Sequence, residues 1–353
     1  MSRFLREQYR DMEPYTPGEQ PKMDDLIKLN TNENPYPPSP AVTKTLHEKN
    51  IEELVRYPDP EASVLTEAIA GHFGVKRSQV AVGNGSDEIL AFIYMAFGEN
   101  IYYPAISYGF YPVFAETFMC TGTEIPLTED LRIDPEDYKG LGGTIIIANP
   151  NAPTGMALTR EEIAGILESN RDNLVVIDEA YVDFGAESCV PLLGKYDNLL
   201  IVQTFSKSHS LAGARIGAAI GSEEIIQDIN KMKFSFNPYN LDRLAILAGT
   251  AAIEDEEYFR ECCGKVIATR KWFVEEMEAL GFEVLPSSAN FIFARNPKIP
   301  GKEYFTKLRE RAIVVRHFDK DPIRDYVRIT IGRDEDMKKL IAVTEEILCG
   351  KVK

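Results

Sequence analysis

The stretch TFSKSHSLAGAR, residues 204–215, decides the fold of this chain. It follows NLLIV, residues 198–202, an apolar run that is typical of a buried strand in a parallel sheet. The predicted strand therefore ends close to Lys207, which has hydroxyl side chains around it and Arg215 downstream. A lysine in these surroundings suits an amine that forms a Schiff base beside a phosphate group. An exposed lysine after a core strand is the simpler interpretation, so the rest of the chain has to decide between the two.

A carboxylate ends a second predicted strand. The apolar run NLVVI, residues 173–177, is followed by Asp178, and Tyr181 comes three residues later. Burying a carboxylate at the end of an apolar strand is costly unless a cation accompanies it. The pyridinium nitrogen of pyridoxal phosphate (PLP) would be such a cation, and Tyr181 could donate to the phenolic oxygen of the same ring. Asp is also a common helix cap, so this motif alone is weak evidence for a PLP site. It becomes strong evidence because Lys207 follows it along the chain.

Three further predicted strands end in segments that can hold a ligand. These strands and the segments after them are 143–148 with NPNAPTG (149–155), 79–82 with GNGSD (83–87), and 101–104 with SYGF (107–110). Two prolines and a glycine make the first segment a rigid turn. The second opens a helix, whose free N–H groups form an anion site, and the third carries Tyr108, which can stack on a planar ring. In an open α/β sheet, ligands bind at the carboxyl ends of the strands, so we expect all these groups at one site.

These motifs resemble those of fold-type I PLP-dependent aminotransferases and, within that group, those of the histidinol-phosphate aminotransferases. The resemblance extends over nearly the whole chain and also includes LNTNENP (29–35), RYPD (56–59) and VRITIG (327–332). It implies PLP as the cofactor. It also implies the interconversion of histidinol phosphate and 2-oxoglutarate with imidazole-acetol phosphate and glutamate, a step of histidine biosynthesis.

The resemblance assigns roles to individual residues. Lys207 would bind the cofactor covalently and act as the base and acid of the proton shift. Asp178 would pair with the ring nitrogen, Tyr181 would contact the phenolic oxygen, and Tyr108 would stack on the ring. The residues implied around the cofactor phosphate are Ser86, Asp87, Thr204, Ser206 and Arg215.

The resemblance also implies a homodimer with shared active sites. Tyr57 matches a tyrosine that reaches the cofactor phosphate of the neighbouring subunit, and Tyr15 resembles a second residue that the partner contributes near the substrate. The residues implied for the far part of the substrate are Asn240, Asn290, Arg316 and Arg328.

Ala152 departs from the family pattern. At this place in the turn the family has an asparagine that donates to the phenolic oxygen of PLP, and alanine has no side-chain donor. Either Tyr181 serves alone, or Asn151 or a water takes the place of the missing donor. Loss of a donor destabilises the phenolate form and can raise the pKa of the cofactor linkage.

Other functions stay open at this point. An aromatic amino acid aminotransferase and a threonine-phosphate decarboxylase share the cofactor residues. An NAD-dependent oxidoreductase would use Gly83 and Gly85 at a strand–helix junction, but its fingerprint requires a third glycine where this chain has Glu88. A catalytically inactive relative is disfavoured because Lys207 and Asp178 are both present.

Composition agrees with a cytoplasmic enzyme. The net charge of −16 argues against nucleic acids and anionic membranes as partners. The N-terminus lacks the apolar core of a signal peptide, and no apolar run reaches membrane-spanning length. The five cysteines and four histidines are scattered without metal-ligand spacing, so no metal is expected.

The 353 residues predict an α/β protein of two domains. We expect residues 1–30 to form an arm that joins the small domain. Residues 31–235 alternate strands and helices, which predicts a large PLP-binding domain with a mostly parallel sheet flanked by helices. A break at residues 233–240 would lead into a long connecting helix, and 236–353 would complete a smaller α+β domain.

Overall fold

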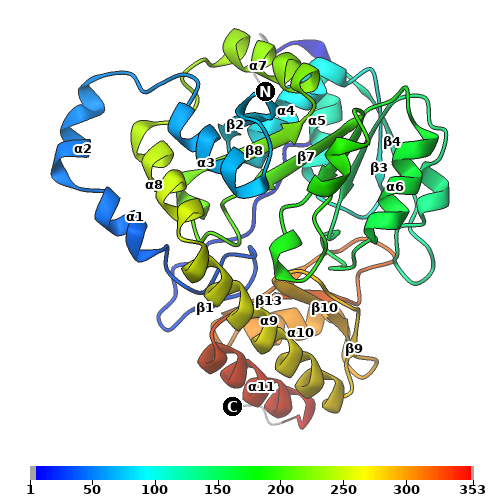
Figure 1. Ribbon diagram of the computed structural model, residues 1–353. Coiled ribbons are helices and arrows are strands. Elements are labelled where there is room, and N and C mark those ends of the chain that lie inside the picture. Colours follow the sequence, from blue (N-terminus) through cyan, green and yellow to red (C-terminus); the bar gives the residue numbers. More distant parts are fainter. Residues whose placement is uncertain (1–4, 351–353) are drawn as a thin grey trace.

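A twisted, mostly parallel sheet forms the centre of the computed structural model, which describes residues 5–350 apart from the side chains of residues 48 and 49 (Figure 1). Within that range the sheet has seven strands, in the order β2 (Val80–Asn84), β8 (Ile216–Gly221), β7 (Leu199–Thr204), β6 (Val175–Asp178), β5 (Thr144–Ala148), β3 (Asn100–Pro104) and β4 (Thr121–Ile125). Strands β7, β6, β5, β3 and β4 run parallel, whereas β8 is antiparallel to both its neighbours. The expected fold class is confirmed.

Helices cover both faces of this sheet, because its central strands are apolar on both sides. Alternate residues of each strand belong to two different cores, as the period of two requires. One core contains Ile145, Ile147 and the helices α3 (Ser63–Phe73), α6 (Arg160–Ser169) and α8 (Arg243–Glu254). The other contains Ile146 and the helices α4 (Ser86–Phe97), α5 (Phe110–Phe118) and α7 (Glu223–Phe236).

A smaller antiparallel sheet lies below the central one, in the order β12 (Arg316–His317), β13 (Val327–Thr330), β10 (Phe291–Arg295) and β9 (Glu283–Val284). The long helix α9 (Glu256–Ala279) runs down to it from the large sheet (Figure 1). With α10 (Gly301–Arg309) and α11 (Asp334–Leu348), α9 encloses a third apolar core. The N-terminal segment joins this part, since β1 (Ile27–Lys28) pairs in parallel with β11 (Ile313–Val314).

Helix α7 ends within residues 233–240, where the sequence predicted a break in the alternation of strands and helices. Helix α7 includes residues 233–236 and ends only at Phe236, so the chain leaves the helix at Asn237. Ser222 caps the start of α7, and Ile226 and Ile229 anchor the helix in the core. The domain limits at residues 30 and 235 stay a prediction.

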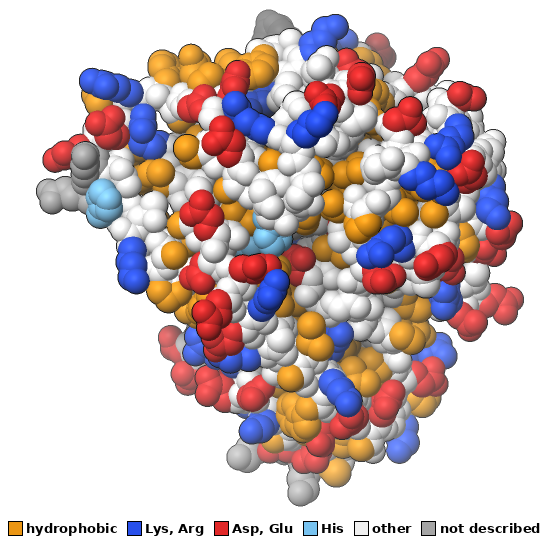
Figure 2. Space-filling model, in the orientation of Figure 1, with side chains coloured by type: hydrophobic (Ala, Val, Ile, Leu, Met, Phe, Trp, Pro, Cys, Tyr) orange, Lys and Arg blue, Asp and Glu red, His pale blue; other side chains and the backbone are white. Residues whose placement is uncertain are grey.

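Large hydrophobic side chains are exposed in two chain segments that meet on the surface. They are Ile51, Leu54, Val55 and Tyr57 in the first segment and Phe234, Phe236 and Tyr239 in the second, and we call them the apolar patch. The rings of Tyr57 and Tyr239 stack with their centroids 4.6 Å apart. Figure 2 shows hydrophobic side chains at the surface near α7, along the upper edge of the view. Across residues 5–350, no helix combines the length and apolar character needed to span a bilayer.

Candidate active site

Two adjoining cavities lie at the carboxyl ends of the strands. The inner cavity, of about 100 Å³, is lined by Ser86, Asp87, Tyr108, Ala148, Ala152, Asp178, Ala180, Tyr181, Thr204, Ser206, Lys207 and Arg215. The outer cavity, of about 620 Å³, opens toward the N-terminal segment and the small sheet. Tyr108, Ala152, Tyr181 and Lys207 line both. The parallel strands thus bring together nine predicted cofactor residues from distant parts of the chain.

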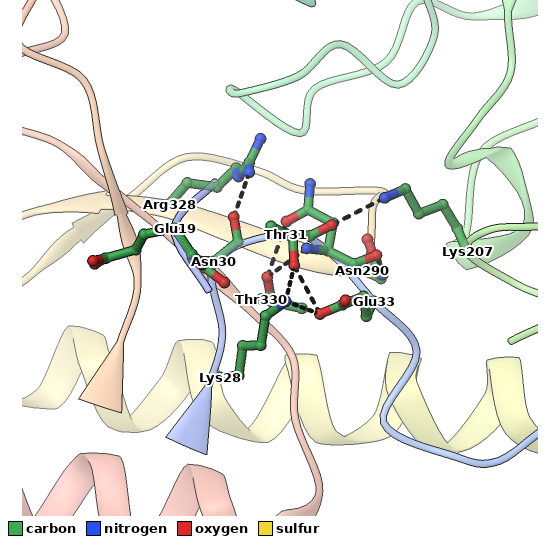
Figure 3. Close-up of polar contacts among 10 residues, drawn as sticks. Glu19, Lys28, Asn30, Thr31, Glu33, Lys207, Asn290, Arg328 and Thr330 are labelled. Atoms are coloured by element: carbon green, nitrogen blue, oxygen red, sulfur yellow. Dashed lines mark hydrogen bonds and ion pairs between the residues drawn. The ribbon is translucent and has the colours of Figure 1, made fainter. Parts of the chain in front are cut away.

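Lys207 follows β7 and extends into both cavities. Its Nζ donates to the carbonyl oxygen of Thr31 at 3.0 Å, a contact between the large sheet and the N-terminal segment (Figure 3). Burial lowers the pKa of Lys207 to about 8, and the positive charge of Arg328 adds to this effect. The amine therefore gives up its proton far more readily than a lysine in water.

Asp178 is the last residue of β6 and is buried. The hydroxyl of Tyr111 donates to its Oδ2 at 3.0 Å, and the backbone N–H of Ala180 donates to Oδ1 at 3.2 Å. Burial raises the pKa of Asp178 to about 6 despite these two donors. Within the described part of the chain no lysine or arginine forms an ion pair with it. A buried carboxylate that faces a cavity without such a cation suits a ligand that brings a proton-bearing nitrogen.

An arginine–aspartate ion pair also lines the inner cavity. Nη2 of Arg215 donates to Oδ2 of Asp87 at 3.0 Å, and Nη1 donates to Oγ of Ser206 at 3.4 Å. Gly85 precedes α4 with a φ of 80°, and Ser86 and Asp87 of its first turn line the inner cavity, which places a helix N-terminus at this cavity. A Cβ atom at Gly217 would collide with the carbonyl carbon of Gly85, so only glycine lets β8 approach this loop.

The remaining groups of the inner cavity hold its walls. The hydroxyl of Tyr108 donates to Oδ1 of Asp87 at 2.7 Å, which fixes the ring at the side of the cavity. Oγ1 of Thr204 accepts from the backbone N–H of Ser206 at 3.2 Å and orients that turn. Ser86 stands at the first turn of α4. The Asp87 carboxylate accepts from both Tyr108 and Arg215, and its negative charge partly neutralises the Arg215 guanidinium.

Arg328 and Arg316 line the outer cavity. Nη2 of Arg328 donates to the carbonyl oxygen of Asn30 at 2.9 Å, whereas its buried Nε has no hydrogen-bond partner among the described residues. Burial lowers the pKa of Arg328. Nη2 of Arg316 lies 3.4 Å from the carbonyl oxygen of Thr16. Both guanidinium groups therefore keep donors that an anion in the cavity can use.

Tyr15 lines the outer cavity of its own chain and stacks on Phe110 with ring centroids 4.2 Å apart. The resemblance implied that Tyr15 reaches the substrate from the partner subunit, and that contribution stays a prediction. The N-terminal segment lines the outer cavity with residues 13–18 and 20 before the chain enters β1, which pairs with β11. Burial raises the pKa of Tyr15, so its hydroxyl stays protonated.

Three predicted residues do not line either cavity. The Asn240 amide donates to Oε2 of Glu88 at 2.6 Å and supports the end of β2. The Asn290 amide donates to the carbonyl oxygen of Asn32 at 3.0 Å and so acts behind the cavity wall. The Tyr57 side chain is exposed in the apolar patch. The contacts predicted for these three residues with the cofactor or the substrate stay predictions.

Sequence reasoning gave no role to the individual residues of the segment 30–32, which connects the sites of Arg328 and Lys207. The carbonyl groups of Asn30 and Thr31 hold these two side chains (Figure 3). The Asn32 side chain donates to the hydroxyl of Tyr181. The motif LNTNENP pointed to this segment without showing its contacts. Tyr111 was also missed, because nothing distinguishes it from a core aromatic of α5 in the sequence.

Comparison with known proteins shows the family of this chain. Residues 24–343 match the family described as aminotransferase class I and II, and the chain belongs to this family. It is 51% identical to a histidinol-phosphate aminotransferase of Brachyspira hyodysenteriae, over 96% of each chain.

Solved structures agree as well. A histidinol-phosphate aminotransferase of Clostridium acetobutylicum, 26% identical, superimposes with a TM-score of 0.85 over 92% of this chain and 100% of that one. The enzyme of that name from Sinorhizobium meliloti, solved with pyridoxal-5'-phosphate, is 24% identical and shares the fold with a TM-score of 0.83 over 92% of each chain.

Proposed function

We propose that this chain is a PLP-dependent aminotransferase that interconverts histidinol phosphate and 2-oxoglutarate with imidazole-acetol phosphate and glutamate. One observation carries the proposal. Lys207, the carboxylate of Asp178 and the guanidinium of Arg215 all face a single inner cavity. The whole-chain identity of 51% to a histidinol-phosphate aminotransferase supports the choice of substrate.

The residues of the inner cavity fit PLP at each of its chemical groups. Asp178 is a buried acceptor that would keep a proton on the ring nitrogen, and Tyr108 forms a wall against which the ring can stack. Arg215, Ser206 and the first turn of α4 form the cradle for the phosphate. When bound, PLP supplies an electron sink for the bonds that break at the α-carbon of the substrate.

Lys207 would move the proton. With a pKa of about 8, its Nζ can accept a proton from the α-carbon of the amine substrate near neutral pH and deliver it again within the site. The same residue would act in reverse order when the 2-oxo acid is converted. The carbonyl oxygen of Thr31 provides a fixed place for Nζ while the amine is free.

The outer cavity would orient the rest of the substrate. Arg328 and Arg316 can bind the phosphate of histidinol phosphate or a carboxylate of 2-oxoglutarate, because both groups accept from a guanidinium fork. Tyr15 and Phe110 form an aromatic wall nearby. Closure of this space by residues 13–20 would exclude water from the reacting atoms.

A homodimer with shared active sites is part of the proposal. The apolar patch exposes several large side chains, as surfaces covered by a partner do. Tyr57, which is 79% exposed, belongs to this patch and would reach the cofactor phosphate of the partner subunit. We also propose a cytoplasmic location.

A half-reaction experiment tests the substrate. Purified protein loaded with PLP would be mixed with histidinol phosphate, phenylalanine, tyrosine or threonine phosphate in turn, and the change in visible absorption followed. We expect the fastest conversion with histidinol phosphate. A faster reaction with phenylalanine would favour an aromatic aminotransferase, and release of carbon dioxide from threonine phosphate would favour a decarboxylase.

A further inference from the structure

Ala152 leaves the inner cavity without the donor that the turn of residues 149–155 would otherwise supply. Its methyl group lines both cavities and packs with Ala289, Phe291 and Tyr181. Asn151 cannot take its place. The Asn151 amide donates to the carbonyl oxygen of Ile106 at 3.0 Å, and its Oδ1 accepts from Ser107 at 2.7 Å, so the side chain is fully engaged on the far side of the turn.

Tyr181 is therefore the protein group that remains beside the position of Ala152. Its hydroxyl oxygen accepts a hydrogen bond from Nδ2 of Asn32 at 3.1 Å. A phenolic oxygen that accepts in this way still has its own proton, which it can donate to another acceptor. Because Tyr181 lines both cavities, a ligand in the cavity is the natural acceptor.

The orientation of the Asn32 amide decides where that proton points. The hydroxyl of Thr330 accepts from the backbone N–H of Asn32 at 3.0 Å and donates to Oδ1 of Asn32 at 3.0 Å. Since Oδ1 is occupied in this way, Nδ2 faces Tyr181. The carbonyl oxygen of Asn32 is held from the other side by Asn290 at 3.0 Å. Asn32 is buried and has a φ of 56°, a conformation in which asparagine is enriched.

We propose that Asn32 is a positioning residue that directs the hydroxyl proton of Tyr181 into the inner cavity, and that this pair replaces the donor missing at Ala152. The inference rests on the proposed function, because the acceptor would be the phenolic oxygen of PLP. Thr330 fixes the direction of the pair through Oδ1. Charged groups also face Tyr181, namely Arg328, Lys207, Asp178 and Asp87, and none of them is altered in the test.

The test is a pH titration of the visible absorption of the PLP-loaded protein. Asn32→Asp keeps the shape of the side chain but has only acceptors, so the proton of Tyr181 would turn toward it. We expect the apparent pKa of the absorption to rise by about one unit, the size of one hydrogen bond. Asp also adds a negative charge, so the same substitution is made in the Tyr181→Phe background. There we expect a smaller rise, from the charge alone, because the hydroxyl that Asn32 directs is gone.

Two uncharged comparisons complete the experiment. Thr330→Val removes the hydroxyl that fixes the amide and should also raise the apparent pKa, whereas Thr330→Ser keeps that hydroxyl and should leave it unchanged. Ala152→Asn returns a donor to the turn and should reverse the effect of Asn32→Asp. Thermal melting of each variant identifies any that are misfolded. If a variant of Asn32 is misfolded, the comparison of Thr330→Val with Thr330→Ser decides whether Asn32 directs the Tyr181 proton.

The outcomes separate the inference from the function on which it rests. Equal rises in the parental background and in the Tyr181→Phe background would show an effect of charge alone and overturn the inference, as would identical titrations of the two Thr330 variants. In either case the proposed function would stand. An unmodified protein that takes up PLP without a visible band linked to Lys207 would overturn the function and the inference together.

Discussion

The hydroxyl of Tyr111 donates to Oδ2 of Asp178 across 3.0 Å, and this contact joins helix α5 to the end of strand β6. This hydrogen bond orients the carboxylate but does not neutralise its charge, since tyrosine remains neutral. Burial raises the pKa of Tyr111 well above its ordinary value, which keeps the proton on the phenol. The two residues therefore form a site that is complete only when a positively charged partner lies beside Asp178.

Asp178→Asn should have opposite effects on stability and on catalysis. The folded protein holds the Asp178 proton more tightly than the unfolded chain, because the pKa is about 6 instead of the ordinary value of 3.8. The free energy of unfolding of the PLP-free protein therefore falls as the pH rises from about 4 to 6. Asparagine lacks this ionisation, so the variant should be about 1–3 kcal/mol more stable at pH 7.

Denaturant melts of the two PLP-free proteins at a pH of about 4.5 and of about 7 measure this difference. Glu179, whose pKa burial raises to about 7, contributes a similar fall to both proteins and cancels in the comparison. With PLP bound, the loss of the charge pair should lower kcat, by an amount that corresponds to about 3 kcal/mol in the activation free energy. A variant that is less stable than the parent at neutral pH would contradict this account of Asp178.

Lys207 should be the residue that borohydride links to the cofactor. Reduction of the PLP-loaded protein followed by peptide mapping is expected to label Lys207, because its side chain lines both cavities. Lys207→Ala should lower the rate of the half-reaction by about 10²–10⁴-fold through the loss of the proton carrier. A label on Lys28 or on any other lysine would show that the assignment is wrong.

Arg328→Ala should weaken the reaction with phosphorylated substrate by about 2–4 kcal/mol in kcat/KM, the range for loss of a charge-assisted contact in a closed site. The loss should be much smaller for an unphosphorylated amine such as histidinol. Arg328→Lys serves as the matched control, because it keeps the charge without the fork and should recover only part of the loss. Equal losses on both substrates would place Arg328 outside the phosphate site.

Mixed dimers test the role of Tyr57. Homodimers of Tyr57→Phe and of Lys207→Ala should each be less active than the unmodified protein. A mixed dimer of the two variants contains one site in which both residues are native. We expect activity above that of either parent after the subunits have been exchanged, with exchange followed by a tag on one chain. Tyr239→Phe is a useful control, since Tyr239 stacks on Tyr57 without being expected at the cofactor. Confirmed exchange without a gain in activity would show that the sites are not shared.

Much of this architecture could be predicted because parallel strands have a simple signal. The runs before Gly83, Asn149, Asp178 and Lys207 are apolar on both faces, so they had to be central strands. Once they were aligned, the polar residues at their carboxyl ends had to meet. Strand β8 was missed because IGAAIG is rich in glycine and alanine, which have little strand propensity and are selected here for close packing.

The rest of the site depends on contacts that leave no pattern in the sequence. Asn290 acts on Asn32 through a backbone carbonyl group, which any residue type possesses. Asn240 resembles a ligand-binding asparagine, yet its amide is engaged by Glu88, a pairing across a long stretch of chain that only the folded structure brings about. Tyr15 depends on the path of a segment with little regular structure, which periodicity cannot predict.

The carbonyl groups of Asn30 and Thr31 belong to consecutive residues, and they hold Arg328 and Lys207. One peptide unit, about 3.8 Å between its Cα atoms, thus separates the anchor of Arg328, the group proposed to bind the substrate, from the anchor of Lys207, the group proposed to react with it. The spacing of these two anchors is therefore set by covalent geometry. Movement of the small sheet would carry both anchors together and leave the distance between them unchanged.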